Sequence, residues 1–249
     1  MKLEIVVVGA TSAVAQAAIR IWAERNASLT LVGRNADELA RIAADARVRR
    51  AADVVVVVGD LTNAAFITTT VAAFNTNSGA TAQALIAHGS LTDSALADAD
   101  VNYLAAELNT NFVSAALWAQ ALAERLSRAD CGGGTVAVIS SVAGDRGRGS
   151  NHAYGAAKAG LTAFCSGLRA RMHTRGVHIV TIKPGFIDSP MTAHITKKGA
   201  LWASPETVAK GIVKAIDKKR DVVYLPSFWH VIMLIIAHVP EAIFKRLKF

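Results

Sequence analysis

Short apolar runs alternate with longer amphipathic stretches along almost the whole chain. The runs cover residues 3–8, 29–32, 54–58, 84–87, 136–139, 177–182 and 222–225. The stretches between them carry helix-forming residues at helical spacing over residues 13–25, 37–49, 64–75, 96–128, 152–175 and 205–218. This alternation predicts an α/β fold with a parallel seven-stranded sheet, doubly wound and covered by helices on both faces. The run of five valines at 54–58 predicts a strand buried on both faces.

A single core suffices for a chain of this size. It has 249 residues, 52% of them hydrophobic, and no linker, repeat or shift in composition divides it. We therefore expect one domain over residues 1–226 and a C-terminal helical extension over residues 227–249. In doubly wound sheets ligands bind beyond the carboxyl ends of the strands, so the site is expected there. The irregular segment 185–204 is long enough to be a mobile loop over that site.

Charge and cysteine content narrow the partners and the compartment. The chain carries 27 Lys and Arg against 19 Asp and Glu, a net charge of +8, which favours phosphates, nucleic acid or an anionic membrane. The basic residues are scattered without an aromatic-rich stripe, so we expect no nucleic-acid partner. Cys131 and Cys165 suit neither a metal site nor a disulfide, and predict packing roles in a reducing cytoplasm. Met1 leads straight into the first apolar run without a leader, which points to the same compartment.

The first apolar run ends in a loop suited to a phosphate. Gly9 allows a tight turn, and the amides of Thr11, Ser12 and Ala13 would point towards an anion at the positive end of the next helix. Ala13 and Ala15 stand where the dinucleotide-binding fingerprint has glycine, and would strain any backbone angle reserved for glycine. Alone, the loop is equally compatible with a plain strand-to-helix turn.

A second segment carries more chemistry. In "SSVAGDRGRGSNHAYGAAK", Ser140 and Ser141 end a predicted strand, and Tyr154 and Lys158 lie four residues apart on a predicted helix. Residues at this spacing share one helix face, so the ammonium would favour the ionised phenol and lower its pKa. A tyrosine with a lowered pKa can donate or accept a proton near neutral pH, and a nearby serine hydroxyl can hold a substrate oxygen.

These residues resemble the short-chain dehydrogenase/reductase family, which has a Rossmann-type fold. The resemblance rests on Ser141 thirteen residues before Tyr154, on "KPGFIDSPM" at 183–191, on Gly59-Asp60, and on Asn111 in "NTNFVSAALWAQAL", and it extends to about residue 225. It implies an NAD(P)H-dependent enzyme that transfers hydride between the cofactor and a carbonyl or secondary alcohol. It also implies a homodimer or homotetramer, formed through the helices beginning near Leu96 and His152.

The resemblance also implies the catalytic roles. Tyr154 would be the acid/base, Ser141 would polarise the carbonyl, and Lys158 would bind the nicotinamide ribose and lower the tyrosine pKa. Asn111 would hold a water that feeds protons to Lys158. Asn109 is close by, but the helix phrase aligns better from Asn111.

The cofactor contacts implied by the family lie at the strand ends. Asp60 would accept from the adenine amino group, Leu61 would bind the ring through its amide, and Ile187 and Ser189 would meet the carboxamide. The full set is Gly9, Thr11, Ser12, Ala13, Val14, Arg34, Asp60, Leu61, His88, Gly89, Tyr154, Lys158, Pro184, Gly185, Ile187 and Ser189. His88 departs from the family pattern Asn-Ala-Gly, and either lines the cofactor groove or packs beneath it as a neutral ring.

The end of the second predicted strand bears on cofactor choice. An NAD-selective site would place a carboxylate there, whereas Arg34 offers a guanidinium suited to a 2′-phosphate. Arg34 therefore favours NADP(H) over NAD(H). The alternative is a solvated arginine at a helix start.

The tail after residue 226 is not needed to complete the fold. Residues 228–239 form an apolar stretch of about twelve residues, too short for a spanning helix of about 20. Lys245, Arg246 and Lys248 follow it. Three interpretations stay open: peripheral contact with an anionic membrane at its inner face, a cap on the substrate pocket, or a subunit interface.

Within the family, the tail and the glycine-poor first loop are similar to bacterial reductases related to the decaprenylphosphoryl keto-ribose reductase. That likeness implies a lipid-linked keto-sugar as substrate, against a small soluble carbonyl compound. A hypothesis of another class is a cofactor-binding scaffold or sensor without turnover.

Overall fold

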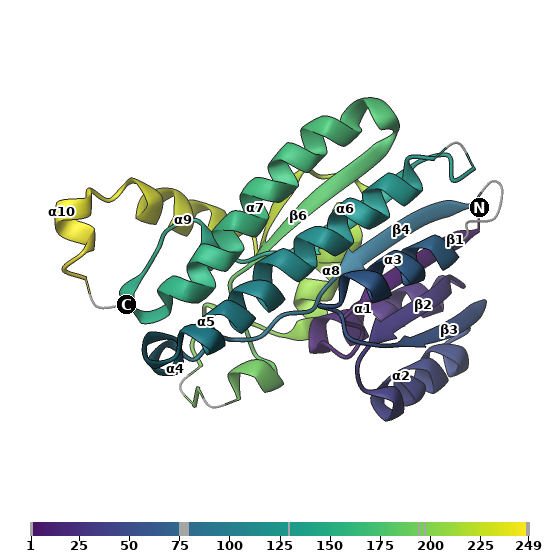
Figure 1. Cartoon of the computed structure of the whole chain (residues 1–249), viewed down its shortest axis with the longest axis horizontal. Coiled ribbons are helices and arrows are strands. Elements are labelled where there is room, and N and C mark those ends of the chain that lie inside the picture. The colour runs from purple at the N-terminus through teal and green to yellow at the C-terminus, as the bar shows by residue number, and fades with distance from the viewer. Residues whose placement is uncertain (1, 75–79, 129, 194, 197, 248–249) are drawn as a thin grey trace.

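The computed structural model contains the expected parallel sheet. It describes residues 2–74, 80–128, 130–193, 195–196 and 198–247, so Asn75 of a predicted helix and Lys248 and Phe249 of the tail lie outside it. Seven strands pair in parallel in the order β3-β2-β1-β4-β5-β6-β9 (Figure 1). They are β1 (Leu3–Val8), β2 (Ser28–Gly33), β3 (Asp53–Val58), β4 (Thr81–Ile86), β5 (Gly134–Ile139), β6 (Val177–Pro184) and β9 (Val222–Leu225). The predicted doubly wound α/β fold is confirmed.

Strand order reverses between β1 and β4. The chain runs outward from β1 to β2 and β3, then returns to place β4 on the other side of β1, where Val8 lies opposite Ile86. Helices that leave the two strands therefore turn to opposite faces and open a crevice at their carboxyl ends. The fold thus provides the ligand-binding crevice that the sequence predicts.

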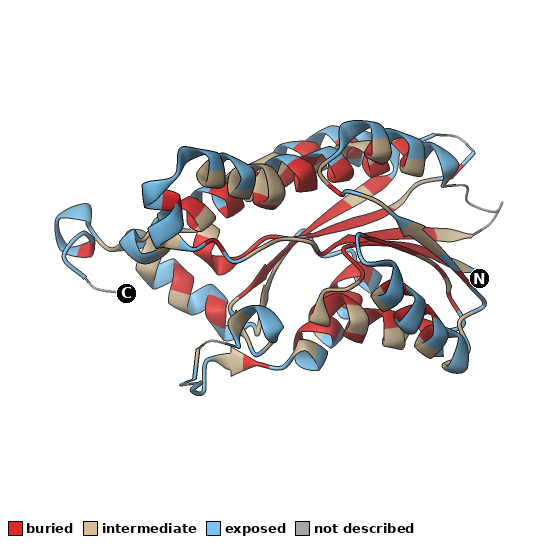
Figure 2. Cartoon of the chain, turned by 60° about the horizontal axis from the view of Figure 1, so that its bottom comes forward, coloured by how far each residue is buried: buried red, intermediate tan, exposed pale blue. Residues whose placement is uncertain are grey.

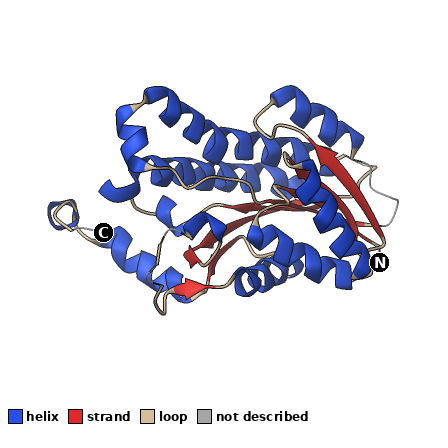
Figure 3. Ribbon diagram, turned by 90° about the horizontal axis from the view of Figure 1, so that it is seen from below, coloured by secondary structure: helices blue, strands red, loops and turns tan. Residues whose placement is uncertain are grey.

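Helices cover both faces of the sheet, as Figures 2 and 3 show. One face packs against α1 (Ala13–Glu24), α2 (Ala36–Val48) and α8 (Pro205–Asp217), with Trp22 fully buried among them. The other packs against α3 (Ala64–Ala73), α6 (Ser114–Leu126) and α7 (His152–Met172), around the buried Trp118. Each helix buries one apolar stripe, so two separate cores hold the sheet between them.

The first loop adopts an unstrained form. Gly9 has φ +79°, and a side chain there would come within 2.6 Å of the His88 backbone nitrogen, so glycine is required at this position. Ala13 and Ala15 lie inside α1, and Ser12 caps it with an extended backbone. Neither alanine adopts a positive φ. The strain considered at these two positions is therefore absent.

The five-valine strand is not buried as expected. β3 is the outer strand of the sheet beside β2, and Val55 and Val58 are 48% and 47% exposed. The prediction was wrong because an edge strand has a neighbour on one side only, and residue type does not reveal strand order.

The long helix expected over residues 96–128 is broken into pieces. α4 (Ser94–Ala99) ends at Asp100, whose extended backbone and side-chain carboxylate cap α5 (Val101–Leu108). A π-helical turn, Asn109–Val113, then leads into α6. Such turns widen a helix locally and occur often at functional sites; this one carries Asn111.

The segment 185–204 is partly ordered into strands. β7 (Phe186–Ile187) pairs with β8 (Trp202–Ala203), and the Phe186 and Trp202 rings stack at 5.3 Å. A 3-10 turn, Pro190–Thr192, lies between them. The described part of this segment therefore forms a wall beside the carboxyl end of β6.

The tail forms α9 (Phe228–His238) and α10 (Glu241–Phe244) at one end of the molecule, shown in yellow in Figure 1. Trp229 and Met233 are buried against Val142, whereas Ile235 is 65% exposed on the opposite side. Arg146 donates to the Ala237 carbonyl at 3.1 Å and pairs with Glu241. No helix in the described part of the chain is long and apolar enough to cross a membrane.

Candidate active site

One cavity of about 500 Å³ lies at the carboxyl ends of the strands. All residues of the predicted site line it: Gly9, Thr11, Ser12, Ala13, Val14, Arg34, Asp60, Leu61, His88, Gly89, Asn111, Ser141, Tyr154, Lys158, Pro184, Gly185, Ile187 and Ser189. They come from segments far apart in the sequence, and the parallel sheet gathers them because its strands end at one edge. Asn109, the alternative to Asn111, is not among the lining residues.

The end of β5 is tied to the start of α7. Ser140 donates to the Lys158 carbonyl at 3.0 Å and shares a 2.7 Å hydrogen bond with Thr162. Ser141 follows with an extended backbone and caps the turn Val142–Gly144 by accepting from Ala143 N at 3.1 Å. These bonds place the Ser141 hydroxyl beside the first turns of α7.

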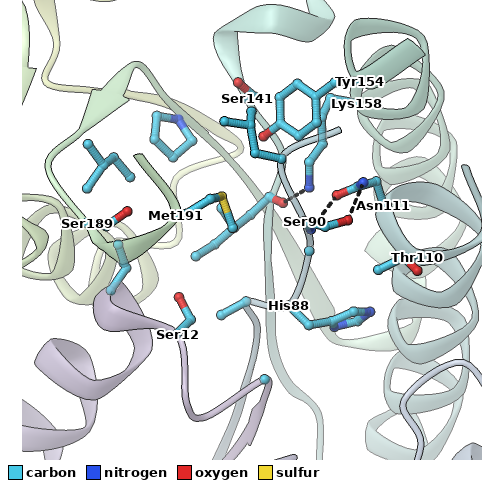
Figure 4. Close-up of a pocket in the computed structure, with 18 of the residues that line it drawn as sticks. Ser12, His88, Ser90, Thr110, Asn111, Ser141, Tyr154, Lys158, Ser189 and Met191 are labelled. Carbon is cyan, nitrogen blue, oxygen red and sulfur yellow. Dashed lines mark hydrogen bonds between the residues drawn. The ribbon is translucent and has the colours of Figure 1, made fainter. Parts of the chain in front are cut away.

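Tyr154 and Lys158 lie one turn apart on α7, as Figure 4 shows. The Lys158 Nζ atom is 5.8 Å from the centre of the Tyr154 ring and donates to the Ile139 carbonyl at 3.2 Å. Burial lowers the pKa of Lys158 to about 8, because a buried ammonium loses hydration. Lys158 therefore lies close to its titration point near neutral pH.

The pKa of Tyr154 moves in the direction opposite to the sequence-based expectation. Burial raises it, and a hydrogen bond with the Ser141 side chain opposes this in part. Desolvation of the phenolate is the larger effect here. The expected lowering by Lys158 is therefore not found in this structure.

Asn111 is held in a polar network that the sequence-based prediction missed. Its Oδ1 atom accepts from Ser90 N at 3.0 Å, and its Nδ2 atom donates to Ser90 Oγ at 3.1 Å and to Glu107 Oε2 at 3.3 Å. The Glu107 carboxylate also accepts from the hydroxyls of Ser90 and Thr92, each at 2.8 Å. A carboxylate four residues before Asn111 was the available signal, since that spacing puts both on one helix face.

The network comes close to Lys158 at Gly89. A Cβ atom on Gly89 would lie 2.9 Å from Asn111 Oδ1 and 3.6 Å from Lys158 Nζ. The absence of a side chain at this position therefore lets the Asn111 amide approach the ammonium. Figure 4 shows Ser90 and Asn111 joined by hydrogen bonds on the wall next to Lys158.

His88 lines the cavity with its backbone side, while its ring points towards α6 (Figure 4). Its Nε2 atom lies 2.8 Å from the Ser114 hydroxyl, which donates to the Leu61 carbonyl at 2.7 Å. The hydroxyl proton is thereby used, so Nε2 carries the ring proton. Burial lowers the pKa of His88 to about 3. Both alternatives are thus combined: a residue in the cavity wall with a neutral, packed ring.

The opposite end of the cavity is formed by α1 and the loops after β2 and β3. The first turn of α1 carries no acidic residue, so its amides and dipole favour an anion. Arg34 is exposed at the cavity rim, and its charge helps to lower the pKa of Asp60, after the larger effect of hydrogen bonds from Thr62. This end therefore suits a ligand that carries phosphates.

Several further lining residues were not anticipated: Ser90, Leu91, Thr110, Arg148 and Asn151. Phe186, Met191 and Thr192 also line the cavity and belong to the segment 185–204 that was expected over the site. Ser189 and Met191 face Thr110 and Asn111 across the cavity in Figure 4. Phe186 also contacts Trp229 of the tail in an edge-on arrangement at 5.2 Å, so the tail abuts this wall.

Comparison with known families now identifies the family of this chain. The family model for short chain dehydrogenases matches residues 4–200. The chain belongs to this family. An uncharacterized oxidoreductase of Mycobacterium tuberculosis is 34% identical over 221 residues, which cover 89% of this chain and 88% of the relative. The ketoacyl reductase HetN of Nostoc is 33% identical over 124 residues, 47% of this chain and 43% of the relative. Family membership makes the chain an oxidoreductase.

Solved structures share the fold at low sequence identity. A short chain dehydrogenase from Burkholderia cenocepacia, in complex with NADP, matches with a TM-score of 0.82 and 19% identity, covering 100% of this chain and 98% of that one. A short-chain dehydrogenase from Sphingobium yanoikuyae, in complex with NADPH, matches with a TM-score of 0.80 and 18% identity, covering 96% and 97%. At these identities the likeness supports the fold alone. The family match ends at residue 200, so the tail lies beyond it.

Proposed function

We propose that this oxidoreductase uses NADP(H) to interconvert a carbonyl and a secondary alcohol, with Ser141, Tyr154, Lys158 and Asn111 as its catalytic set. The observation that carries the proposal is the convergence of these four side chains on the cavity that also contains the N-terminus of α1. If Tyr154 and Lys158 were only a coincidental pair on a structural helix, we would not expect a serine, a buried asparagine and an anion-binding helix end beside them.

Each catalytic side chain has a task that its surroundings allow. The Tyr154 hydroxyl, neutral because burial raises its pKa, donates its proton to a substrate oxygen in reduction and takes it back in oxidation. The Ser141 hydroxyl orients and polarises that oxygen. Lys158, with a pKa lowered to about 8, returns a proton towards Tyr154. Asn111 lies next to Lys158 and leads to the polar network behind it.

The residues present fit a nicotinamide dinucleotide. When bound, this cofactor donates or accepts the hydride. Gly9 leaves the backbone open at the loop, and the amides from Thr11 to Val14 would hold the pyrophosphate at the start of α1. Asp60 and Leu61 would hold the adenine, His88 and Gly89 would line the groove, and the segment from Pro184 to Ser189 would meet the carboxamide.

The preference for NADP(H) rests on Arg34. Its guanidinium lies at the cavity rim after β2, where a 2′-phosphate would be bound. Three of the similar structures contain NADP or NADPH, which agrees with the proposal. The test is a side-by-side binding titration of NADPH and NADH, followed by a screen of ketones and keto-sugars for cofactor oxidation.

The alternative is a scaffold or sensor that binds the cofactor without turnover. The complete set of Ser141, Tyr154 and Lys158 in one cavity argues against it. The same screen separates the two, because a scaffold would bind NADPH and oxidise it with none of the carbonyl compounds.

The tail supports a second proposal: peripheral attachment of a cytoplasmic protein to an anionic membrane, with a lipid-linked keto-sugar as the substrate. Val231, Leu234 and Ile235 form an exposed apolar stripe on α9, and Lys245 and Arg246 follow α10. Such a stripe beside basic residues suits the surface of an anionic bilayer. The buried side of α9 meets Val142 and Phe186 near the cavity, where an apolar chain of the substrate would leave it.

Vesicle binding tests this second proposal. The variant Val231→Ser, Leu234→Ser, Ile235→Ser keeps the buried Trp229 and Met233. It should lose co-sedimentation with vesicles that contain phosphatidylglycerol, and unchanged co-sedimentation would contradict membrane contact through α9. A soluble carbonyl substrate remains the competing proposal, and the substrate screen decides between them.

We also propose that residues 1–226 form one domain and that the protein assembles as a homodimer or homotetramer. Support comes from apolar side chains exposed on the helices between β4 and β5: Leu96, Val101, Val113 and Leu117. Light scattering after size-exclusion chromatography tests it, and a monomeric mass would refute the oligomer.

A further inference from the structure

Within the residues that the structure describes, four charged side chains line the cavity: Arg34, Asp60, Arg148 and Lys158. The proposed function assigns Arg34 and Asp60 to the cofactor and Lys158 to the catalytic set. Arg148 is left without a role. It belongs to the segment that joins the Ser141 turn to Tyr154, the two residues that the proposed function places at the substrate oxygen.

Arg148 is half-buried. Among the described residues, no side chain or carbonyl forms a hydrogen bond or ion pair with its guanidinium. Arg146, two residues earlier, is fully engaged, since it binds the Ala237 carbonyl and Glu241 and lies 4.4 Å from the Phe244 ring centre. Burial lowers the pKa of Arg148, but an arginine side chain still keeps its proton in proteins. A desolvated cation of this kind is stabilised by an anion.

Asn151 adds an unpaired acceptor to the same turn. Its Oδ1 atom is buried and has no hydrogen-bond partner within the described ranges, and the residue lines the cavity. Its backbone N–H donates to the Arg148 carbonyl at 3.2 Å, so the two residues are joined through one short turn. Although Asn151 is the residue before α7, its side chain does not cap that helix. Buried acceptors are rarely left unpaired, which points to a donor group on a ligand.

From these observations we infer that Arg148 and Asn151 form an anion subsite on the substrate side of the cavity. The ligand class is a carbonyl or alcohol compound that carries a phosphate or carboxylate together with a hydroxyl group. The guanidinium binds the anionic group, for which its planar fork is suited, and the Asn151 carbonyl accepts from the hydroxyl. This assignment rests on the proposed function, because it supplies the substrate class for that site.

Two matched pairs of ketones test the subsite: dihydroxyacetone phosphate with dihydroxyacetone, and levulinate with methyl levulinate. Binding is measured by ligand-detected NMR on the full chain loaded with NADP⁺, because the oxidised cofactor cannot reduce a ketone. We expect the anionic member of at least one pair to bind about tenfold more tightly or better. The pair that shows the larger ratio distinguishes phosphate from carboxylate.

Four variants test whether Arg148 and Asn151 cause this preference. Arg148→Gln should bring the ratio within each pair close to one, and Arg148→Lys should restore part of it. Arg128→Gln removes the same charge from an exposed position just beyond the C-terminal end of α6, and should leave the ratio unchanged. Asn151→Ala should weaken dihydroxyacetone more than methyl levulinate, because only the former carries hydroxyls.

The subsite is refuted by equal binding within both pairs in the wild type, by a preference that survives Arg148→Gln, or by failure of both anionic probes to bind. NADPH affinity separates this failure from that of the proposed function. Arg148→Gln should bind NADPH as the wild type does. A wild-type chain that binds no NADPH would overturn the proposed function and the subsite with it.

Discussion

Glu107 offers a demanding test of how the polar wall of the cavity is held. Replacing it by leucine removes the acceptor for three donors: Ser90 Oγ, Thr92 Oγ1 and Asn111 Nδ2. Hydrogen bonds to a charged group contribute roughly 1.5–3 kcal/mol each when buried, and we take about 1 kcal/mol each because Glu107 is half-buried and water can replace part of the loss. Burial of the leucine side chain offsets about 1 kcal/mol. The net loss in free energy of unfolding is about 2 kcal/mol.

Urea denaturation measures this loss, and thermal denaturation should show a melting temperature lower by about 4–8 °C. The control is Glu24→Leu, because Glu24 has one ion pair, to Arg49, with its side chain 60% exposed. That variant should change the free energy of unfolding by about 0.5 kcal/mol or less. Equal effects of the two substitutions would refute the reasoning.

A double-mutant cycle locates the loss in the network. Thr92→Val removes one donor to Glu107 while keeping the side-chain shape. The effects of Thr92→Val and Glu107→Leu should be non-additive by about 1 kcal/mol. Strict additivity would mean that the 2.8 Å contact between them contributes nothing to stability.

Three other changes have defined outcomes. Burial lowers the pKa of Lys158 to about 8, so between about pH 8 and pH 10.5 the unfolded chain binds one more proton than the folded chain. The wild type should therefore gain stability relative to Lys158→Met, by up to about 3 kcal/mol, as the pH rises across that window. A constant difference between their denaturation curves across the window would contradict the lowered pKa. Gly9→Ala should cost at least about 3 kcal/mol in thermal or urea denaturation, because it combines an unfavourable φ with a clash at the His88 backbone, whereas Gly132→Ala, at φ +69° with open space around it, should cost only about 1 kcal/mol. Arg34→Asp should shift the ratio of NADPH to NADH affinity by about tenfold or more towards NADH in fluorescence titrations, and an unchanged ratio would remove Arg34 from the 2′-phosphate site.

The positions of the strands along the chain and their parallel type could be predicted because they follow from local periodicity and from the alternation of strands with helices. The apolar runs 3–8 and 222–225, for example, coincide with β1 and β9. Because the strands are parallel, the loops that follow them lie at the same edge of the sheet. Of the set Ser141, Tyr154 and Lys158, the proximity of Tyr154 and Lys158 could likewise be predicted from their spacing, since both lie on one helix. These features could be predicted without knowing which residues pack against each strand or helix.

Features that depend on tertiary neighbours could not be predicted. The exposure of Val55 follows from the edge position of β3, and the pKa of Tyr154 rises because of burial, which residue spacing does not report. The π-helical turn at Asn111 meets the Ser90 loop through the hydrogen bond from Ser90 N to Asn111 Oδ1, a contact between segments that residue spacing does not report. The packing of Trp229 on Val142 joins segments that no periodicity connects.

The central claim is that Tyr154 transfers the proton in a hydride-transfer reaction. Its most direct test is the turnover of NADPH by the wild type and by Tyr154→Phe, with the best carbonyl substrate of the screen and with NADPH affinity measured in parallel. We predict that Tyr154→Phe binds NADPH as the wild type does and loses at least about 100-fold in kcat, the range expected for removing a general acid. Turnover by Tyr154→Phe at the wild-type rate, with equal cofactor binding, would contradict the account.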